Sequence, residues 1–126
     1  MSQTILFIED LLTCREPIAV ALRKSGYRVF CAETARAALN LIDDHCPDLI
    51  LMDLALPDMS GQEFLQALRQ LPHFQHIPAI VFSGSGNVMH LLGGLGVYCC
   101  LVKSVDAVTE IKAAIAKALG EEKGKD

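Results

Sequence analysis

The most informative part of the sequence for the architecture is Leu49-Ile-Leu-Met-Asp53-Leu-Ala-Leu-Pro57-Asp-Met-Ser-Gly61. It opens with a continuous apolar run, which is typical of a parallel strand buried on both faces. An acid ends the run at Asp53, and proline and aspartate then favour a turn. An apolar stripe at helical spacing follows from Gly61 to Leu71. The stretch therefore predicts a strand, a turn and a helix in succession.

The same pattern recurs on both sides of this stretch. Predicted strands are Thr4–Ile8, Arg28–Ala32, Leu49–Met52, Ile77–Phe82 and Val97–Val102. A first helix is predicted between Pro17 and Gly26, with Ile18, Ala21 and Leu22 on its apolar face, and a second begins after its cap Thr34. Three further helices are predicted from Gly61 to Leu71, from Asn87 to Leu92, which is short, and from Asp106 to Gly120. We therefore predict an α/β fold with a doubly wound, five-stranded parallel sheet. All strands except Arg28–Ala32 are continuously apolar, as strands covered on both faces require.

Composition excludes several functional classes. The chain has 126 residues, which fits a single domain, and a net charge of −4 without a dense basic run, which argues against nucleic-acid binding. No apolar run approaches the ~20 residues of a membrane span, and Glu9 and Asp10 interrupt the start too early for a signal peptide. The 5 cysteines are odd in number and lack C-x-x-C spacing, so we expect free thiols and a cytoplasmic protein.

Chemically distinctive side chains follow four of the predicted strands. Glu9 and Asp10 follow the first, Asp53 the third, Ser83 the fourth and Lys103 the fifth. Right-handed crossovers bring all these strand ends to one edge of a parallel sheet, where ligands bind. Clustered carboxylates repel one another unless a hard cation such as Mg²⁺ joins them. A carboxylate nucleophile, a metal, an ammonium and a hydroxyl are together the parts of an aspartyl-phosphate site.

With these residues in order, the sequence resembles the receiver domain of two-component response regulators over nearly its whole length. The motifs that carry the resemblance are Ile8-Glu9-Asp10, the stretch from Leu51 to Gly61, Val81-Phe-Ser83-Gly84 and Leu101-Val-Lys103. The middle motif is the most specific, because its aspartate, proline and glycine all have the family's spacing. The resemblance implies a flavodoxin-like sheet with strand order 2-1-3-4-5.

The resemblance also implies a role for each site residue. Asp53 would accept a phosphoryl group from a histidine kinase or a phosphotransfer protein, and Lys103 and Ser83 would contact the phosphoryl oxygens. Mg²⁺ would be bound directly by Asp10, Asp53 and the backbone carbonyl of Ala55, and through water by Glu9. The domain would be a signalling switch rather than an enzyme, since it catalyses only its own phosphorylation and dephosphorylation.

Some positions depart from the family pattern and leave a second function open. Ser104 replaces the usual proline after the lysine, Cys100 replaces the usual aromatic residue, and the fourth helix is short. These departures favour a pseudo-receiver, a protein-interaction module that works without phosphorylation. A haloacid-type phosphatase is disfavoured, because Ala55 stands where it would have a second acid. Asp58 is expected to be a turn residue rather than a further metal ligand.

No Asp, Glu, Lys or Arg occurs between Gln70 and Val102. Two buried strands explain part of this span, and two interpretations remain for the part between them. The segment from Asn87 to Leu95 is either an exposed apolar patch, so that a downstream protein docks near Gly84–Gly96, or a short helix that is itself buried. We assign residues 1–120 to the receiver domain and residues 121–126 to a charged C-terminal tail or the start of a linker.

Overall fold

The computed structural model describes residues 3–84, 92–104 and 106–124, of which 121–124 are described by their backbone alone. The strands are β1 (Thr4–Ile8), β2 (Arg28–Ala32), β3 (Leu49–Asp53), β4 (Ala79–Ser83) and β5 (Val97–Val102). The helices are α1 (Leu12–Lys24), α2 (Ala35–His45), α3 (Gly61–Arg69), the 3₁₀ helix η1 (Pro72–Phe74) and α4 (Ala107–Gly124). The short helix predicted from Asn87 to Leu92 falls almost entirely outside the described residues.

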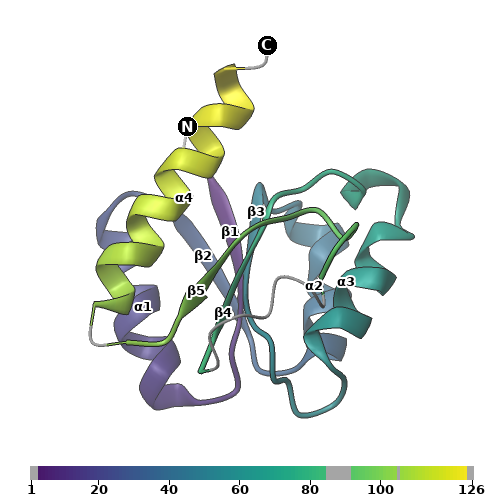
Figure 1. Cartoon of the computed structure of the whole chain (residues 1–126), viewed down its shortest axis with the longest axis horizontal. Coiled ribbons are helices and arrows are strands. Elements are labelled where there is room, and N and C mark those ends of the chain that lie inside the picture. Colours follow the sequence, from purple (N-terminus) through teal and green to yellow (C-terminus); the bar gives the residue numbers. More distant parts are fainter. Residues whose placement is uncertain (1–2, 85–91, 105, 125–126) are drawn as a thin grey trace.

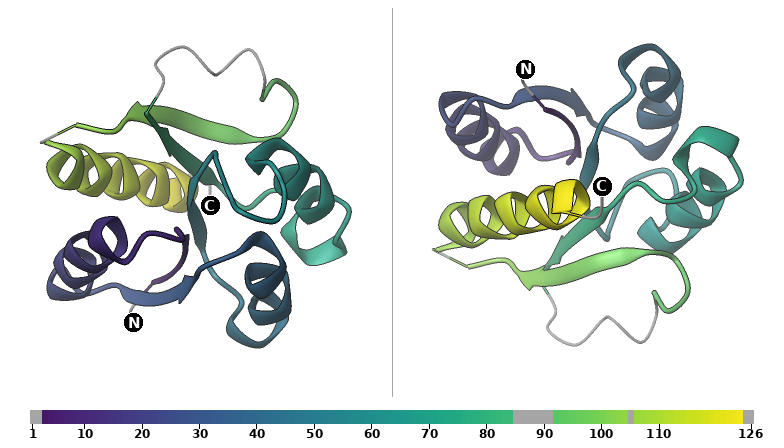
Figure 2. Two further views of the ribbon diagram at one scale, coloured as in Figure 1. Left: turned by 90° about the horizontal axis from the view of Figure 1, so that it is seen from below. Right: turned by 90° about the horizontal axis from the view of Figure 1, so that it is seen from above.

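All five strands form one parallel sheet in the order β2-β1-β3-β4-β5. Helices α1 and α4 cover one face of the sheet, and α2 and α3 cover the other (Figures 1 and 2). The predicted fold and strand order are confirmed. Within the described part of the chain, no helix combines the length and the apolar character needed to cross a membrane.

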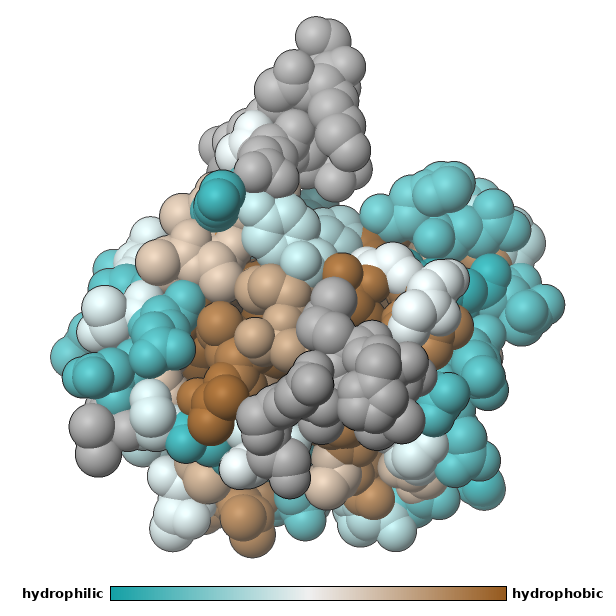
Figure 3. Space-filling view, in the orientation of Figure 1, coloured by the Kyte–Doolittle hydropathy of each residue, from teal (hydrophilic) through white to brown (hydrophobic). Residues whose placement is uncertain are grey.

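The alternation of side chains along each strand divides the core between the two faces. Leu6 and Ile8 of β1 pack on the α2/α3 side, whereas Ile5 and Phe7 pack on the α1/α4 side. Strand β5 departs from the prediction of burial on both faces, because it is an edge strand and is only half-buried. Its last residue, Val102, is 47% exposed, and Figure 3 shows apolar side chains gathered on this side of the molecule.

The helix ends follow the capping residues that the sequence supplies. Thr34 accepts a hydrogen bond from the N–H of Ala37 at the start of α2, and Ser60 and Glu63 form a reciprocal capping box at the start of α3. Gly26 follows α1 with a φ of +100°, as a C-terminal glycine should. Helix α1 begins at Leu12, upstream of Pro17, so the proline lies inside the helix, where it costs one backbone hydrogen bond.

Arg69 fixes the start of β5 to the end of α3. Its guanidinium donates hydrogen bonds to the backbone carbonyls of Leu95 (2.8 Å), Phe74 (2.9 Å) and Gly96 (3.1 Å). A Cβ at Gly96 would lie 2.8 Å from Nη2 of Arg69, so the guanidinium occupies the space that the missing side chain leaves. The last turn of α3, the 3₁₀ helix and the segment before β5 are therefore held by one side chain.

The prediction that the last helix ends at Gly120 is wrong, because α4 continues to Gly124. Glycine in a helix interior costs only about 1 kcal/mol relative to alanine. The preceding turn is anchored by Ala118 and Leu119, which are buried against the α1 side of the sheet. Packing of this turn outweighs the weak preference of glycine to end the helix.

Gly120→Ala should therefore stabilise the protein by about 0.5–1 kcal/mol, because glycine carries an entropy cost inside a helix. Urea unfolding measures this change. Gly26→Ala is the matched control: a Cβ meets nothing within 4 Å at either position, but only Gly26 has a positive φ. The control should be destabilised. A destabilised Gly120→Ala would show that the helix ends there.

Candidate functional site

The site lies at the edge of the sheet where the strands end. Asp53 is the last residue of β3 and Ser83 the last of β4, while Glu9 and Lys103 directly follow β1 and β5. Backbone hydrogen bonds extend the sheet by one step at both flanks, from Glu9 N to Ala32 O (3.0 Å) and from Lys103 N to Ser83 O (2.8 Å). The sheet register thus places the predicted residues on adjacent strands.

Three carboxylates converge in this place. Oxygens of Glu9, Asp10 and Asp53 lie within 4.8 Å of one another. Glu9 is 0% and Asp53 6% exposed, whereas Asp10 faces solvent. Oε2 of Glu9 is buried and has no hydrogen-bond partner. An all-oxygen donor set with an unsatisfied buried oxygen fits a hard divalent cation such as Mg²⁺.

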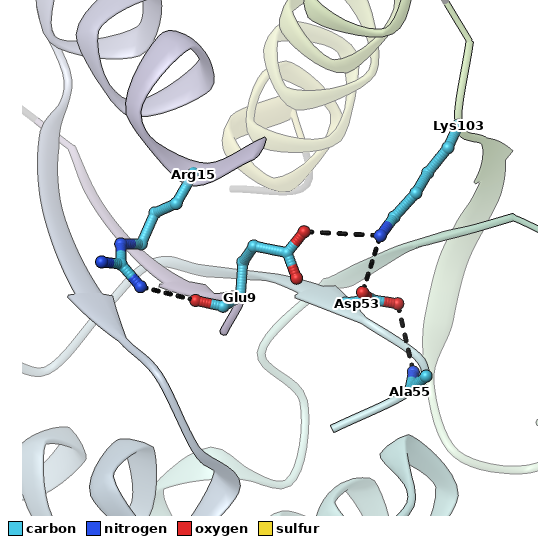
Figure 4. A network of polar contacts seen from close by, with 5 residues as sticks. All are labelled: Glu9, Arg15, Asp53, Ala55 and Lys103. Carbon is cyan, nitrogen blue, oxygen red and sulfur yellow. Dashed lines mark hydrogen bonds and ion pairs between the residues drawn. The ribbon is translucent and has the colours of Figure 1, made fainter. Parts of the chain in front are cut away.

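Lys103 supplies the positive charge of the cluster. Its Nζ donates to Asp53 Oδ2 at 2.7 Å and to Glu9 Oε1 at 3.4 Å (Figure 4), and it lies 5.2 Å from the centre of the Phe82 ring. Partial burial lowers the pKa of Lys103, but the hydrogen bonds and charges of Asp53 and Glu9 outweigh this effect and raise it. Lys103 therefore keeps its charge at every physiological pH.

Among the three acids of this cluster, Glu9 has a raised pKa. Burial above all, followed by the closeness and the negative charge of the Asp53 carboxylate, raises the pKa of Glu9 from its ordinary value of 4.5 to about 7. Lys103 opposes this shift without cancelling it. Without a cation, the site therefore holds a proton on Glu9 through much of the acidic range.

The loop after Asp53 folds back on the carboxylate. Ala55 N–H donates to Asp53 Oδ1 at 3.1 Å, and Gly61 N–H donates to Leu54 O at 2.8 Å. A Cβ at Gly61 would approach Leu54 O to 2.9 Å, which explains why the chain has glycine at this spacing from the aspartate. Two contacts thus hold the loop against Asp53.

Asp58 in this loop does not join the carboxylate cluster. Its two carboxylate oxygens accept hydrogen bonds from the backbone N–H groups of Ala35 (3.0 Å) and Arg36 (2.9 Å) at the start of α2. These bonds, that of Arg36 above all, lower the pKa of Asp58. The prediction of a turn residue rather than a metal ligand agrees with this position, but the sequence did not reveal that Asp58 ties the loop to another helix.

Two of the three departures from the family pattern lie in the described residues, and both have structural roles. The Ser104 carbonyl accepts the N–H of Ala107, and its hydroxyl lies 3.5 Å from Glu110 Oε1, so Ser104 helps to begin α4. Cys100 is partly buried and packs against the core on the α2/α3 side.

Arg15 is a site neighbour that the sequence did not single out. It reaches from α1 and donates to the backbone carbonyl of Glu9 at 2.9 Å (Figure 4). Its target is a backbone atom, so no pair of side chains in the sequence signals the contact.

Comparisons with known proteins agree with this geometry. A sequence model of the response regulator receiver domain matches residues 5–116. The phosphate regulon transcriptional regulatory protein PhoB of Pseudomonas aeruginosa is 38% identical over 77% of this chain and 42% of its own length. The KDP operon transcriptional regulatory protein KdpE of Escherichia coli is 42% identical over 63% of this chain and 34% of its own length. The chain thus spans less than half the length of either relative.

A solved structure gives the same result for the fold. The CheY-like response regulator receiver domain protein of Methanospirillum hungatei superposes with a TM-score of 0.89 over 100% of both chains, at 24% sequence identity. The family match covers most of the chain, from the first strand into the last helix. This chain belongs to the response regulator receiver domain family of two-component signalling.

Proposed function

We propose that the chain is a phosphoacceptor switch whose Asp53 receives a phosphoryl group from a histidine kinase or a phosphotransfer protein. The observation that carries this proposal is the environment of the Asp53 carboxylate. One oxygen is held by Lys103 and the other by the N–H of Ala55, and Glu9 and Asp10 offer further oxygens beside it. The carboxylate is thus nearly buried, oriented and surrounded by groups that can accommodate added charge.

This arrangement supports a chemical role for each residue. A carboxylate oxygen of Asp53 attacks phosphorus as the bond from the donor to phosphorus breaks, and water later attacks the acyl phosphate to restore the carboxylate. Lys103 remains charged and neutralises the phosphoryl oxygens, while the Ser83 hydroxyl donates to one of them. Asp10, Asp53 and the Ala55 carbonyl would hold Mg²⁺, with Glu9 acting through water, and this ion would supply charge neutralisation.

We extend the proposal to the wider setting of the domain. Residues 1–120 form the receiver, and residues 121–126 are its charged tail or the start of a linker, whose first part, to Gly124, continues α4. The domain works in the cytoplasm, does not itself bind nucleic acid and presents the region of Gly84–Gly96 to a downstream protein. The exposed Val102 beside this region supports an apolar docking surface.

Acetyl phosphate or phosphoramidate with Mg²⁺ should add one phosphoryl group to the wild-type protein and none to Asp53→Asn. Intact-mass spectrometry measures the adduct, and circular dichroism checks that the variant stays folded. Asp44→Asn, an exposed acid on α2, is the charge-matched control and should be labelled like the wild type. An unlabelled wild type would favour the phosphorylation-independent pseudo-receiver, and a labelled Asp53→Asn would place the phosphoryl group elsewhere.

Mg²⁺ should raise the melting temperature of the wild-type protein, because a ligand that binds only the folded state stabilises it. Asp10→Asn should lose most of this increase, whereas Asp44→Asn should keep it. Thermal unfolding with and without Mg²⁺ measures both. An undiminished response of Asp10→Asn would exclude Asp10 as a ligand.

The stability of the metal-free protein should depend on the proton of Glu9. Because the pKa of Glu9 is raised from 4.5 to about 7 in the folded state, protonation of Glu9 stabilises the folded protein. This stabilisation is complete below pH 4.5 and is lost as pH rises through 7. Glu9→Gln resembles the protonated form and should lack this loss. The test is to measure the free energy of unfolding of the wild type and of Glu9→Gln in the presence of a chelator, from below pH 4.5 to above pH 7. The difference between the two proteins should change across this range. A difference independent of pH would contradict it.

A further inference from the structure

Arg15 makes two contacts of different character. Its Nη1 donates to the backbone carbonyl of Glu9 at 2.9 Å, and its Nη2 lies 3.3 Å from Glu33 Oε1. The side chain of Arg15 is 12% exposed, whereas that of Glu33 is 71% exposed. An ion pair with so exposed a partner contributes little. The hydrogen bond to the Glu9 carbonyl is therefore the more important of the two contacts of this nearly buried guanidinium.

The Glu9 carbonyl lies at the point where the chain leaves the sheet. The N–H of Glu9 still bonds to Ala32 O of β2, while the carbonyl on the other side of the residue accepts from Arg15. This carbonyl belongs to the peptide plane that joins Glu9 to Asp10. Because the sheet holds the N–H and Cα of Glu9, rotation of that plane would chiefly change the direction of the Asp10 carboxylate relative to Glu9 and Asp53.

Figure 4 shows that Glu9 is held from opposite sides, by Arg15 on its backbone and by Lys103 on its side chain. By its charge alone, Arg15 would repel a divalent cation, and Glu33 offsets that charge. Any favourable effect of Arg15 on cation binding must therefore come from the geometry that it imposes. Contacts behind a metal ligand commonly have such an effect on affinity.

We propose that Arg15 is a positioning residue for the divalent-cation site, which orients the Glu9–Asp10 peptide through its hydrogen bond to the Glu9 carbonyl. This role rests on the proposed function, because the cation site serves the phosphorylation of Asp53. Arg15 does not contact the reacting atoms. It acts through the two acids that its hydrogen bond places.

The test separates geometry from charge. The double variant Arg15→Met with Glu33→Gln keeps the net charge of the protein but loses the hydrogen bond to Glu9. Glu33→Gln alone removes the ion pair and keeps that bond. Isothermal titration with Mg²⁺ should give about tenfold weaker binding for the double variant than for the wild type, which has the same net charge, whereas Glu33→Gln should bind like the wild type. Equal affinity of the double variant and the wild type would overturn the proposal.

Two further measurements exclude a merely structural role. Phosphorylation by acetyl phosphate should require about tenfold more Mg²⁺ for half its maximal rate in the double variant, with the maximal rate restored at saturating Mg²⁺. A maximal rate that stays low while the affinity is unchanged would contradict positioning. Arg15→Lys keeps the charge and can still donate to the Glu9 carbonyl, so it should recover part of the affinity. Should the double variant not fold, Arg15→Gln replaces it, and wild-type affinity of Arg15→Gln with unshifted Glu9 and Asp10 amide resonances would overturn the proposal.

The same experiment distinguishes failure of the function from failure of this inference. A wild-type protein that binds Mg²⁺ but takes up no phosphoryl group would contradict the proposed function. The comparison of Mg²⁺ affinities would still decide whether Arg15 positions the site.

Discussion

Parallel strands that end at one edge of a sheet bring their terminal side chains together, and here those side chains include buried carboxylates. Glu9 and Asp53 are both nearly inaccessible to water, so their charges are poorly screened. Lys103 offsets one negative charge by contacting both groups. Burial, together with the nearby Asp53 carboxylate, raises the pKa of Glu9, and the second carboxylate oxygen of Glu9 is buried without a hydrogen-bond partner. With Asp10 ionised beside them, the three carboxylates exceed the charge of Lys103 by two, and a divalent cation would offset both charges.

The rest of the structure keeps this crowded arrangement rigid. The loop after Asp53 is closed by Gly61 and attached to α2 by Asp58, on the opposite face of the sheet from α1 and α4. From the other face, Arg15 of α1 holds the backbone of Glu9. Helices of both layers therefore contribute to the position of the acids. Phosphoryl transfer depends chiefly on positioning and charge, so such support bears directly on the proposed reaction.

Sequence patterns predicted the parts of this structure that follow from one general rule. The apolar runs defined the strands, and the common edge of a parallel sheet placed Glu9, Asp53, Ser83 and Lys103 near one another. Features that depend on tertiary contacts were not predictable in the same way. The carbonyl of Glu9 and the N–H groups of α2 are present at every residue, so nothing in the sequence marks them as partners of Arg15 or Asp58.

The helix ends show the limit of local signals. Pro17 and Gly120 are both unfavourable inside a helix, yet α1 and α4 include them. Each costs a few kcal/mol at most, which the burial of neighbouring apolar side chains outweighs. Edge position likewise leaves β5 half-exposed although its sequence is as apolar as that of a central strand. Burial is a property of the assembled sheet and not of the strand alone.

The contact between Arg69 and the segment before β5 has a consequence for how these positions can vary. The guanidinium reaches three carbonyls in different directions, and a lysine ammonium lacks the planar fork that does so. Gly96 has a φ of +72° and no room for a side chain beside that guanidinium. An asparagine at position 96 could adopt this positive φ, but its side chain would need a smaller residue at position 69. Positions 69 and 96 are thus linked in one direction: a side chain at position 96 requires the guanidinium of Arg69 to move or to be replaced.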